Sequence, residues 1–179
     1  MAFKTFYNQE VVPKLIHEFG YKNKHAVPTV TSVTLNVGLG AGLKEAKIIE
    51  TAEKTLTRIT GQKPVSTKAR KSISAFKIRE GNVVGMKVTL RGKRMWDFLE
   101  KLIKVSLPRV RDFRGLSPKA FDGQGNYSIG FREHIAFPEI RSDEIELIHG
   151  LQVTIATSAK DDTQARSLLK HLGLPLKTD

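Results

Sequence analysis

The apolar residues of this chain repeat with two spacings, one typical of helices and one typical of strands. Apolar positions three and four apart predict helices at residues 3–19, 48–59, 95–103 and 162–172. Apolar positions that alternate with polar ones predict strands at residues 33–37, 84–90, 127–131 and 151–155. We therefore expect an α+β fold, with a mostly antiparallel sheet and helices packed on one face of it.

Proline and polar residues mark where these elements begin and turn. Pro13 must kink the first helix or lie in a first turn, because proline lacks the N–H that a helix interior needs. Asp161, with Gln164 three residues later, is a candidate N-cap of the last helix. The turn signal at residues 80–82 precedes a strand, so residues from about 72 to 82 are expected to project as a hairpin loop.

Length and composition narrow the class of protein. The 179 residues, 40% of them apolar, suffice for a single domain over residues 1–179 with its own packed core. The absence of cysteine excludes disulfides, zinc ribbons and thiol nucleophiles. The first residues do not form a signal peptide, and no apolar run approaches the roughly 18 residues that span a bilayer. We expect a cytoplasmic protein without a membrane partner.

The positive charge of the chain is concentrated in its middle. The formal net charge is +12, and residues 63–114 hold fifteen Lys and Arg against four Asp and Glu. Charge gathered in one stretch creates a field that a polyanion can read. Nucleic acid is therefore the first partner to consider, although a solvated basic loop remains the simpler alternative.

The polar positions of the expected strands carry hydroxyls, amides and cations but no aromatic rings. These positions are Ser32, Thr34, Asn36, Lys87, Thr89, Arg91, Ser128, Arg132, Gln152 and Thr154. Such groups suit phosphates and 2′-hydroxyls of a structured RNA better than they suit unpaired bases. An ordinary solvated sheet face remains the alternative. Phe76 either stacks at the loop tip or is buried in the core, and the sequence favours neither.

Residues typical of catalysis or cofactor binding are not arranged for it. The glycine-rich turn at residues 38–42 lacks the third glycine of a dinucleotide-binding motif, because that position is Leu43. The five histidines lack metal-ligand spacing and are expected at the surface or in helix packing. We expect no enzyme activity, no cofactor and no small-molecule substrate. The alternatives kept open are a nucleotide-dependent enzyme and a general basic chaperone or membrane-surface protein.

Six segments of the chain closely resemble the bacterial family of the fifth large-subunit ribosomal protein, which binds 5S rRNA. These segments are Gly61–Pro64, Ser72–Gly81, Val88–Gly92, Leu107–Gly115, Phe121–Tyr127 and Phe137–Glu139. The resemblance implies a structural protein of the ribosome's central protuberance that helps attach 5S rRNA to the large-subunit rRNA. It also implies that the basic loop reaches the P-site tRNA and that the protein takes part in a bridge to a small-subunit protein.

The residues and the resemblance together give three sets of candidate residues. The rRNA-binding candidates are Asn36, Gln62, Lys63, Ser66, Lys68, Arg70, Lys71, Lys87, Thr89, Arg91, Arg94, Arg109, Arg111, Arg114 and Asn126. The candidates for tRNA contact are Ser72, Ser74, Phe76, Lys77, Arg79, Glu80 and Gly81. The candidates for the protein bridge, chosen by position and negative charge, are Glu139, Asp143, Glu144 and Glu146.

Overall fold

The computed structural model describes residues 2–40, 46–140 and 148–177, and these residues fold into two compact units. The first unit comprises Met1–Val33, Leu90–Ile129 and Thr154–Asp179, and the second comprises Thr34–Thr89 and Gly130–Val153. The expectation of one domain over the whole chain stays a prediction.

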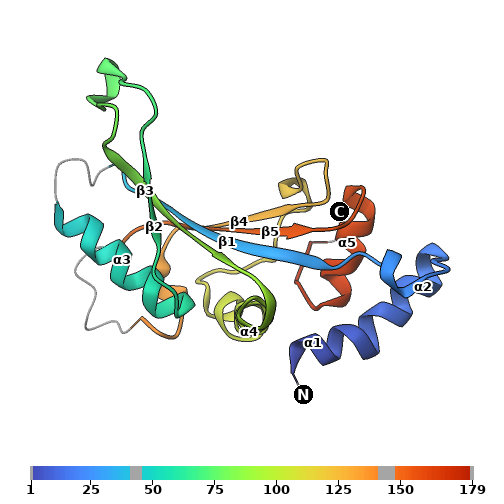
Figure 1. The fold of residues 1–179 in the computed structure, drawn as a ribbon. Coiled ribbons are helices and arrows are strands. Elements are labelled where there is room, and N and C mark those ends of the chain that lie inside the picture. Colours follow the sequence, from blue (N-terminus) through green and yellow to red (C-terminus); the bar gives the residue numbers. More distant parts are fainter. Residues whose placement is uncertain (1, 41–45, 141–147, 178–179) are drawn as a thin grey trace. The chain divides into compact units, whose positions relative to one another are not determined.

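One five-stranded antiparallel sheet supplies strands to both units (Figure 1). Its strands are β1 (Val30–Gly38), β2 (Val65–Lys68), β3 (Val83–Leu90), β4 (Tyr127–Phe131) and β5 (Leu151–Thr157). They lie in the order β2-β3-β1-β5-β4. The predicted α+β class is confirmed, and four of the five strands are the predicted ones. The sequence did not predict β2, because three of its four residues are polar and the basic run hides its alternation.

The first unit contains two helical segments that widen into π-helical turns just before a proline. The N-terminal helix runs through α1 (Phe3–Phe6), a π-helical stretch (Tyr7–Val11) and α2 (Val12–Phe19), with Pro13 in the first turn of α2. Likewise α4 (Gly92–Lys101) continues as a π-helical stretch (Leu102–Ser106) before Pro108. A proline ring clashes with the carbonyl four residues earlier, so the preceding turn bonds over five residues instead. Pro13 therefore occupies a first turn, as one of the two predicted alternatives has it.

Aromatic and aliphatic side chains join the helices of the first unit. Trp96 of α4 lies between Phe3 and Tyr7, with ring centroids 6.2 and 5.2 Å away. The last helix, α5 (Asp162–His171), buries Ala165, Leu168 and Leu169. Its predicted N-cap is confirmed, because the Gln164 N–H donates to Asp161 Oδ1 at 2.8 Å.

In the second unit one helix and the inner face of the strands form the core. Helix α3 (Ala46–Thr60) buries a stripe that includes Leu56 and Ile59, and Gly61 follows it with a φ of 65°. Buried strand residues alternate with partly exposed ones along β1 and β3. Short 3-10 turns complete the two units at Lys24–Ala26, Ser74–Phe76, Leu107–Arg109, Pro118–Ala120 and His134–Ala136.

Candidate nucleic-acid interface

The candidate cations of the basic stretch are exposed, as their charge predicts. These twelve residues are Lys63, Lys68, Arg70, Lys71, Lys77, Arg79, Lys87, Arg91, Arg94, Arg109, Arg111 and Arg114. Two of them lie near carboxylates, Lys63 at 3.5 Å from Glu53 and Arg111 at 3.9 Å from Asp112. Within the described parts of the chain, Lys68, Arg70 and Lys71 form no ion pair. Their charges are therefore available to an external anion.

The polar face of the second unit's strands brings several candidate residues together. Thr34 Oγ1 of β1 lies 3.3 Å from Thr89 Oγ1 of β3, so these strands meet with their hydroxyls on one face. Asn36 and Lys87 share this face by the two-residue period of a strand, and both are at least partly exposed. The face offers hydroxyl, amide and ammonium groups side by side, which are donors for phosphate and sugar oxygens.

The register of β2 divides its residues between the two faces. Val65 pairs with Lys87 and therefore lies on the polar face, whereas Ser66 pairs with Met86, which is buried. Ser66 is exposed because β2 is an edge strand. The candidates Ser66 and Lys87 are thus on opposite faces.

The candidates Gln62 and Lys63 follow Gly61, just after the end of α3. Gln62 is half-buried and Lys63 is exposed.

The first unit carries a similar but separate set of polar groups. Ser128 Oγ of β4 and Thr154 Oγ1 of β5 lie 3.0 Å apart. Arg91 is exposed where β3 ends, and Arg94 is exposed in the first turn of α4. These residues repeat the chemistry of the second unit's polar face, with hydroxyls and guanidinium groups and no aromatic ring among them.

Backbone hydrogen bonds close the loop between β2 and β3 at two levels, and the loop extends beyond the ends of both strands (Figure 1). Next to the strands, the Ala69 N–H donates to Asn82 O at 2.8 Å and the Gly81 N–H to Ala69 O at 3.0 Å. Nearer the tip, Ile73 and Ile78 exchange both of their hydrogen bonds, at 2.9 and 3.1 Å. The predicted projecting loop is therefore a hairpin whose shape is held by its own backbone.

Several candidates for tRNA contact also hold this hairpin in shape. Ser72 Oγ accepts a hydrogen bond from the Glu80 N–H at 2.9 Å, and Ser74 O accepts one from the Lys77 N–H at 3.0 Å. Lys77 has a left-handed backbone with a φ of 54°, which four-residue hairpin loops commonly require at one position. Arg79 and Gly81 are exposed. The sequence did not predict the structural role of Ser72, because a serine within a basic run is equally typical of a side chain that donates a hydrogen bond to phosphate.

The exposure of Phe76 shows whether its ring lies at the loop tip or is buried in the core, which the sequence left open. Its side chain is 70% exposed at the loop tip, and that of Ile73 is 45% exposed. Phe76 is therefore not part of the core.

The loop at residues 107–126 contains only short 3-10 turns, yet hydrogen bonds within the protein fix its backbone. The Leu116 N–H donates to Pro175 O and the Lys177 N–H to Leu116 O, at 2.8 and 2.9 Å. Farther along, both oxygens of Asp162 accept hydrogen bonds from the N–H groups of Gly123 and Gly125. The cations of this loop, at residues 109, 111 and 114, thus project from a defined backbone.

Asn126, a candidate for rRNA binding, has its side chain engaged within the protein. Its Nδ2 donates to Asp122 Oδ2 at 2.7 Å, and its Oδ1 accepts from the Thr157 N–H at 3.2 Å. Hydrogen bonds from the Asn126 side chain and from backbone N–H groups hold the pKa of Asp122 below its usual value. Asn126 therefore shapes the loop, and its partly exposed edge is what an RNA could reach.

Most of the candidates for the protein bridge lie outside the described residues. Asp143, Glu144 and Glu146 fall within residues 141–147. Glu139 is described, and its side chain is half-buried.

Two histidines form a stacked pair on either side of this acidic segment, which the sequence did not predict. The rings of His134 and His149 lie 4.2 Å apart at an angle of 9°, and His134 Nδ1 accepts a hydrogen bond from the His149 N–H. His134 is buried outside the α-helices, so the expectation that the histidines lie at the surface or in helix packing is wrong for His134, whereas His149 is half-buried. Burial lowers the pKa of both rings, which favours their neutral forms.

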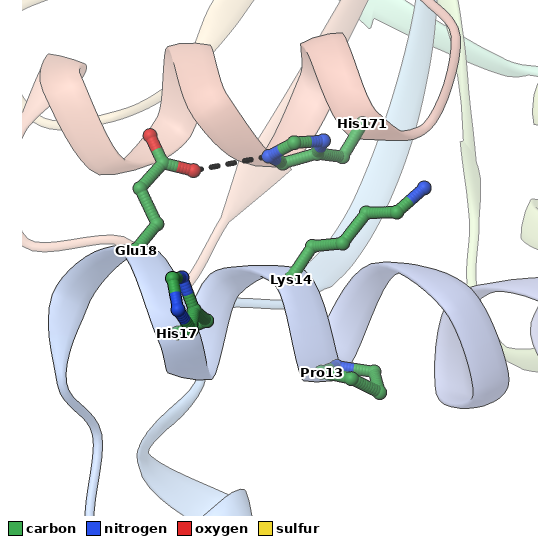
Figure 2. A pocket seen from close by; sticks show the side chains of 5 residues that line it. All are labelled: Pro13, Lys14, His17, Glu18 and His171. Atoms are coloured by element: carbon green, nitrogen blue, oxygen red, sulfur yellow. Dashed lines mark hydrogen bonds and ion pairs between the residues drawn. The ribbon is translucent and has the colours of Figure 1, made fainter.

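A shallow hollow of about 450 Å³ lies between α2 and α5 and is lined by Pro13, Lys14, His17, Glu18 and His171 (Figure 2). Its carboxylate is already engaged, because Glu18 Oε2 lies 2.5 Å from Ser167 Oγ and 3.0 Å from His171 Nε2. These hydrogen bonds, that from Ser167 foremost, lower the pKa of Glu18. Among the described residues no three side chains are placed to hold a metal ion. The Glu18 carboxylate therefore connects α2 with α5.

No helix within the described ranges is long and apolar enough to cross a membrane, in agreement with the hydropathy of the sequence.

Comparison with known proteins identifies the family. Residues 23–79 match the family described as ribosomal protein L5, and residues 83–176 match the model of the C-terminus of that ribosomal family. The chain is 55% identical over 175 residues to the large ribosomal subunit protein uL5 of Synechocystis sp., covering 98% of this chain and 97% of that protein. It is 56% identical over 176 residues to the protein of the same name from Desulfatibacillum aliphaticivorans, covering 98% of each.

The chain therefore belongs to the ribosomal protein L5 family. It is a structural constituent of the large subunit of the ribosome and not an enzyme, which confirms the resemblance seen in the sequence and excludes the nucleotide-dependent enzyme.

Proposed function

We propose that the exposed cations between Lys63 and Arg114 bind 5S rRNA and help attach it to the large-subunit rRNA in the central protuberance. The observation that carries this proposal is the run of Lys68, Arg70 and Lys71, three exposed cations that form no ion pair within the described residues. A folded protein gains little from holding like charges so close together, whereas a polyanion gains a binding site. The polar face of the second unit's strands supplies hydrogen-bond donors within the same unit as these cations.

Cationic and neutral polar side chains are expected to play different roles in binding the RNA. Lysine and arginine neutralise phosphates, which sets the affinity and makes it depend on salt. Asn36 and Thr89 on the polar face donate to sugar and phosphate oxygens, which fixes the register of the RNA against the sheet. Because no aromatic ring lies on that face, the RNA is recognised there by its backbone shape.

Salt dependence of 5S rRNA binding tests this proposal. Each neutralised phosphate contributes roughly 0.7–0.9 to the slope of log affinity against log salt. Replacing Lys68, Arg70 and Lys71 together by Ala is expected to lower that slope by about two to three. The matched control replaces Lys22, Lys24 and Lys160, which are equally exposed but lie outside the candidate set, and is expected to leave the slope unchanged. Equal slopes for the two variants would contradict the proposal.

We further propose that the hairpin loop at residues 72–81 contacts the P-site tRNA. Its support is the family resemblance together with a loop that is exposed, cationic and closed by its own hydrogen bonds. In large subunits reconstituted with a Lys77→Ala, Arg79→Ala variant, tRNA is expected to dissociate faster from the P site. 5S rRNA binding is expected to persist, because the cations of β2 and of the 107–126 loop remain. Unchanged tRNA dissociation would contradict this part.

The proposed bridge to a small-subunit protein is supported by charge alone. The segment that contains Glu139, Asp143, Glu144 and Glu146 is acidic in a basic chain, and a basic ribosomal partner would complement it. Replacing these four residues by Gln or Asn is expected to weaken subunit association, measured by light scattering at fixed Mg²⁺. Association that does not change would argue against this segment as the bridge.

A further inference from the structure

The tip of the hairpin loop carries the most exposed large apolar side chain of the described residues. Phe76 is 70% exposed, compared with 62% for Val65 and 55% for Ile148. Ile73, in the same loop, is 45% exposed, so the tip carries two exposed apolar side chains. Covering them would gain about 25 cal/mol for each Å² of apolar surface buried. The loop tip is therefore a candidate contact surface for a partner.

The backbone presents this ring in a fixed direction. Phe76 ends the 3-10 turn Ser74–Phe76, and the paired residues Ile73 and Ile78 close the loop beneath it. Lys77 follows in a left-handed conformation, which turns the chain back toward β3. Because the loop is already closed, a partner that covers the ring would not have to order the backbone first, which lowers the cost of binding.

The charges around the ring decide which partner fits. Lys71, Lys77 and Arg79 are exposed close to Phe76 in the sequence, and Glu80 is the one carboxylate between residues 63 and 96. An exposed planar ring in a loop that also carries exposed cations matches a nucleobase, which offers a flat π face with a phosphate on each side. An apolar pocket on a protein would instead have to bury or displace the three cations.

We propose that Phe76 stacks on a nucleobase of the RNA that the loop contacts, either an unpaired base or the open face of a terminal base pair. This inference rests on the proposed contact between the loop and the P-site tRNA and adds its binding mode: cations hold the backbone and one ring covers a base. It also explains why the strand faces need no aromatic residue, because stacking is confined to the loop tip.

The experiment compares three variants of the full chain, each reconstituted into large subunits, with deacylated tRNA as the probe. Phe76→Leu keeps an apolar side chain but removes the π face, and Phe76→Trp enlarges that face. Lys77→Ala with Arg79→Ala removes charge and leaves the ring. Removing an aromatic side chain that stacks on a base typically weakens binding on the order of 5- to 150-fold. Hydrogen exchange at the amides of Ile73 and Ile78 confirms in each variant that the loop is still closed.

Stacking predicts faster tRNA dissociation with Phe76→Leu and equal or slower dissociation with Phe76→Trp. The fluorescence of the new tryptophan, taken as the difference from wild-type subunits so that Trp96 and the tryptophans of the other subunit proteins cancel, is expected to be quenched when tRNA binds. If Phe76→Leu behaves as the wild type while the charge variant loses tRNA, stacking is wrong and the loop contact stands. If neither variant changes tRNA dissociation, both ideas are wrong. Loss of a protein contact but not of tRNA in Phe76→Leu would also overturn the inference.

Discussion

Gly85 of β3 is the glycine whose replacement the structure predicts to be most damaging to the polar face. A Cβ at this position would lie 2.9 Å from Val37 O and 2.9 Å from Thr67 Oγ1. Ordinary contacts of a Cβ begin near 3.4 Å, so the neighbours would have to move by about 0.5 Å. Thr67 lies on the edge strand and can rotate, but the Val37 carbonyl belongs to β1, which has a strand on each side.

The size of the effect follows from the rigidity of that carbonyl. Crowding a packed site in this way typically costs about 1–3 kcal/mol. In a chain of this length 1 kcal/mol shifts the melting temperature by roughly 2–4 °C, so Gly85→Ala is expected to lower it by roughly 2–12 °C. Displacement of β1 from β3 would also separate the hydroxyls of Thr34 and Thr89, which now lie 3.3 Å apart.

Thermal unfolding followed by circular dichroism measures this, with Gly130→Ala as the matched control. Gly130 also lies within a strand, its φ is not positive, and nothing lies within 4 Å of the Cβ that alanine would add. The control is expected to be neutral or to gain up to about 1 kcal/mol, because alanine loses less conformational freedom on folding. Equal melting temperatures for the two variants would refute the argument from close packing.

Two further predictions concern the contact of Glu18 with α5 and the backbone of Lys77 in the hairpin loop. The lowered pKa of Glu18 means that its hydrogen bonds with Ser167 and His171 stabilise the fold above the usual pKa of about 4.5 and are lost as the pH falls through the lowered value. Glu18→Gln is thus expected to cost no more than about 1 kcal/mol at pH 7, since the side chain is 45% exposed. In urea titrations the difference from wild type is expected to shrink as the pH is lowered below about 4.5, and a difference that grows toward low pH would contradict this. Lys77→Val is expected to open the loop tip, because a β-branched residue tolerates a φ of 54° poorly, whereas Lys77→Gly keeps it closed. Faster amide exchange at Ile73 and Ile78 in the valine variant alone is the expected readout, and equal rates in both would contradict it.

Hydrophobic periodicity predicted most of the fold, because a buried face imposes its spacing on the sequence. The alternation of Val33, Leu35 and Val37 located β1, and the four-residue spacing of Ala52 and Leu56 located α3. Strand β2 escaped because it lies at the edge of the sheet and buries too little to need apolar residues. The sequence left open whether Pro13 kinks its helix or lies in a first turn, and the structure places it in the first turn of α2. The π-helical turns before Pro13 and Pro108 were not predicted, because hydrophobic spacing does not distinguish a widened turn from a regular one.

The candidate site was predictable in its charge but not in its contacts. The count of cations in residues 63–114 predicts an exposed basic stretch whatever the details of the fold. The roles of Asn126 and Ser72 were not predictable, because each is engaged by a residue that only the folded chain brings near. The stacked pair of His134 and His149 was missed for the same reason, since fifteen residues separate the two rings. Phe76 could not be placed because an aromatic residue in a short loop is found both buried and exposed.

Lysine reactivity in the complex with 5S rRNA tests the central claim most directly. Acetylation of the full chain, alone and bound to 5S rRNA, followed by mass spectrometry, reports which ammonium groups the RNA covers. Protection is expected at the four lysines among the rRNA-binding candidates, Lys63, Lys68, Lys71 and Lys87. Lys22, Lys24 and Lys160 are expected to react as in the unbound protein. The opposite pattern, with the stretch still reactive in the complex and the control lysines protected, would contradict the account.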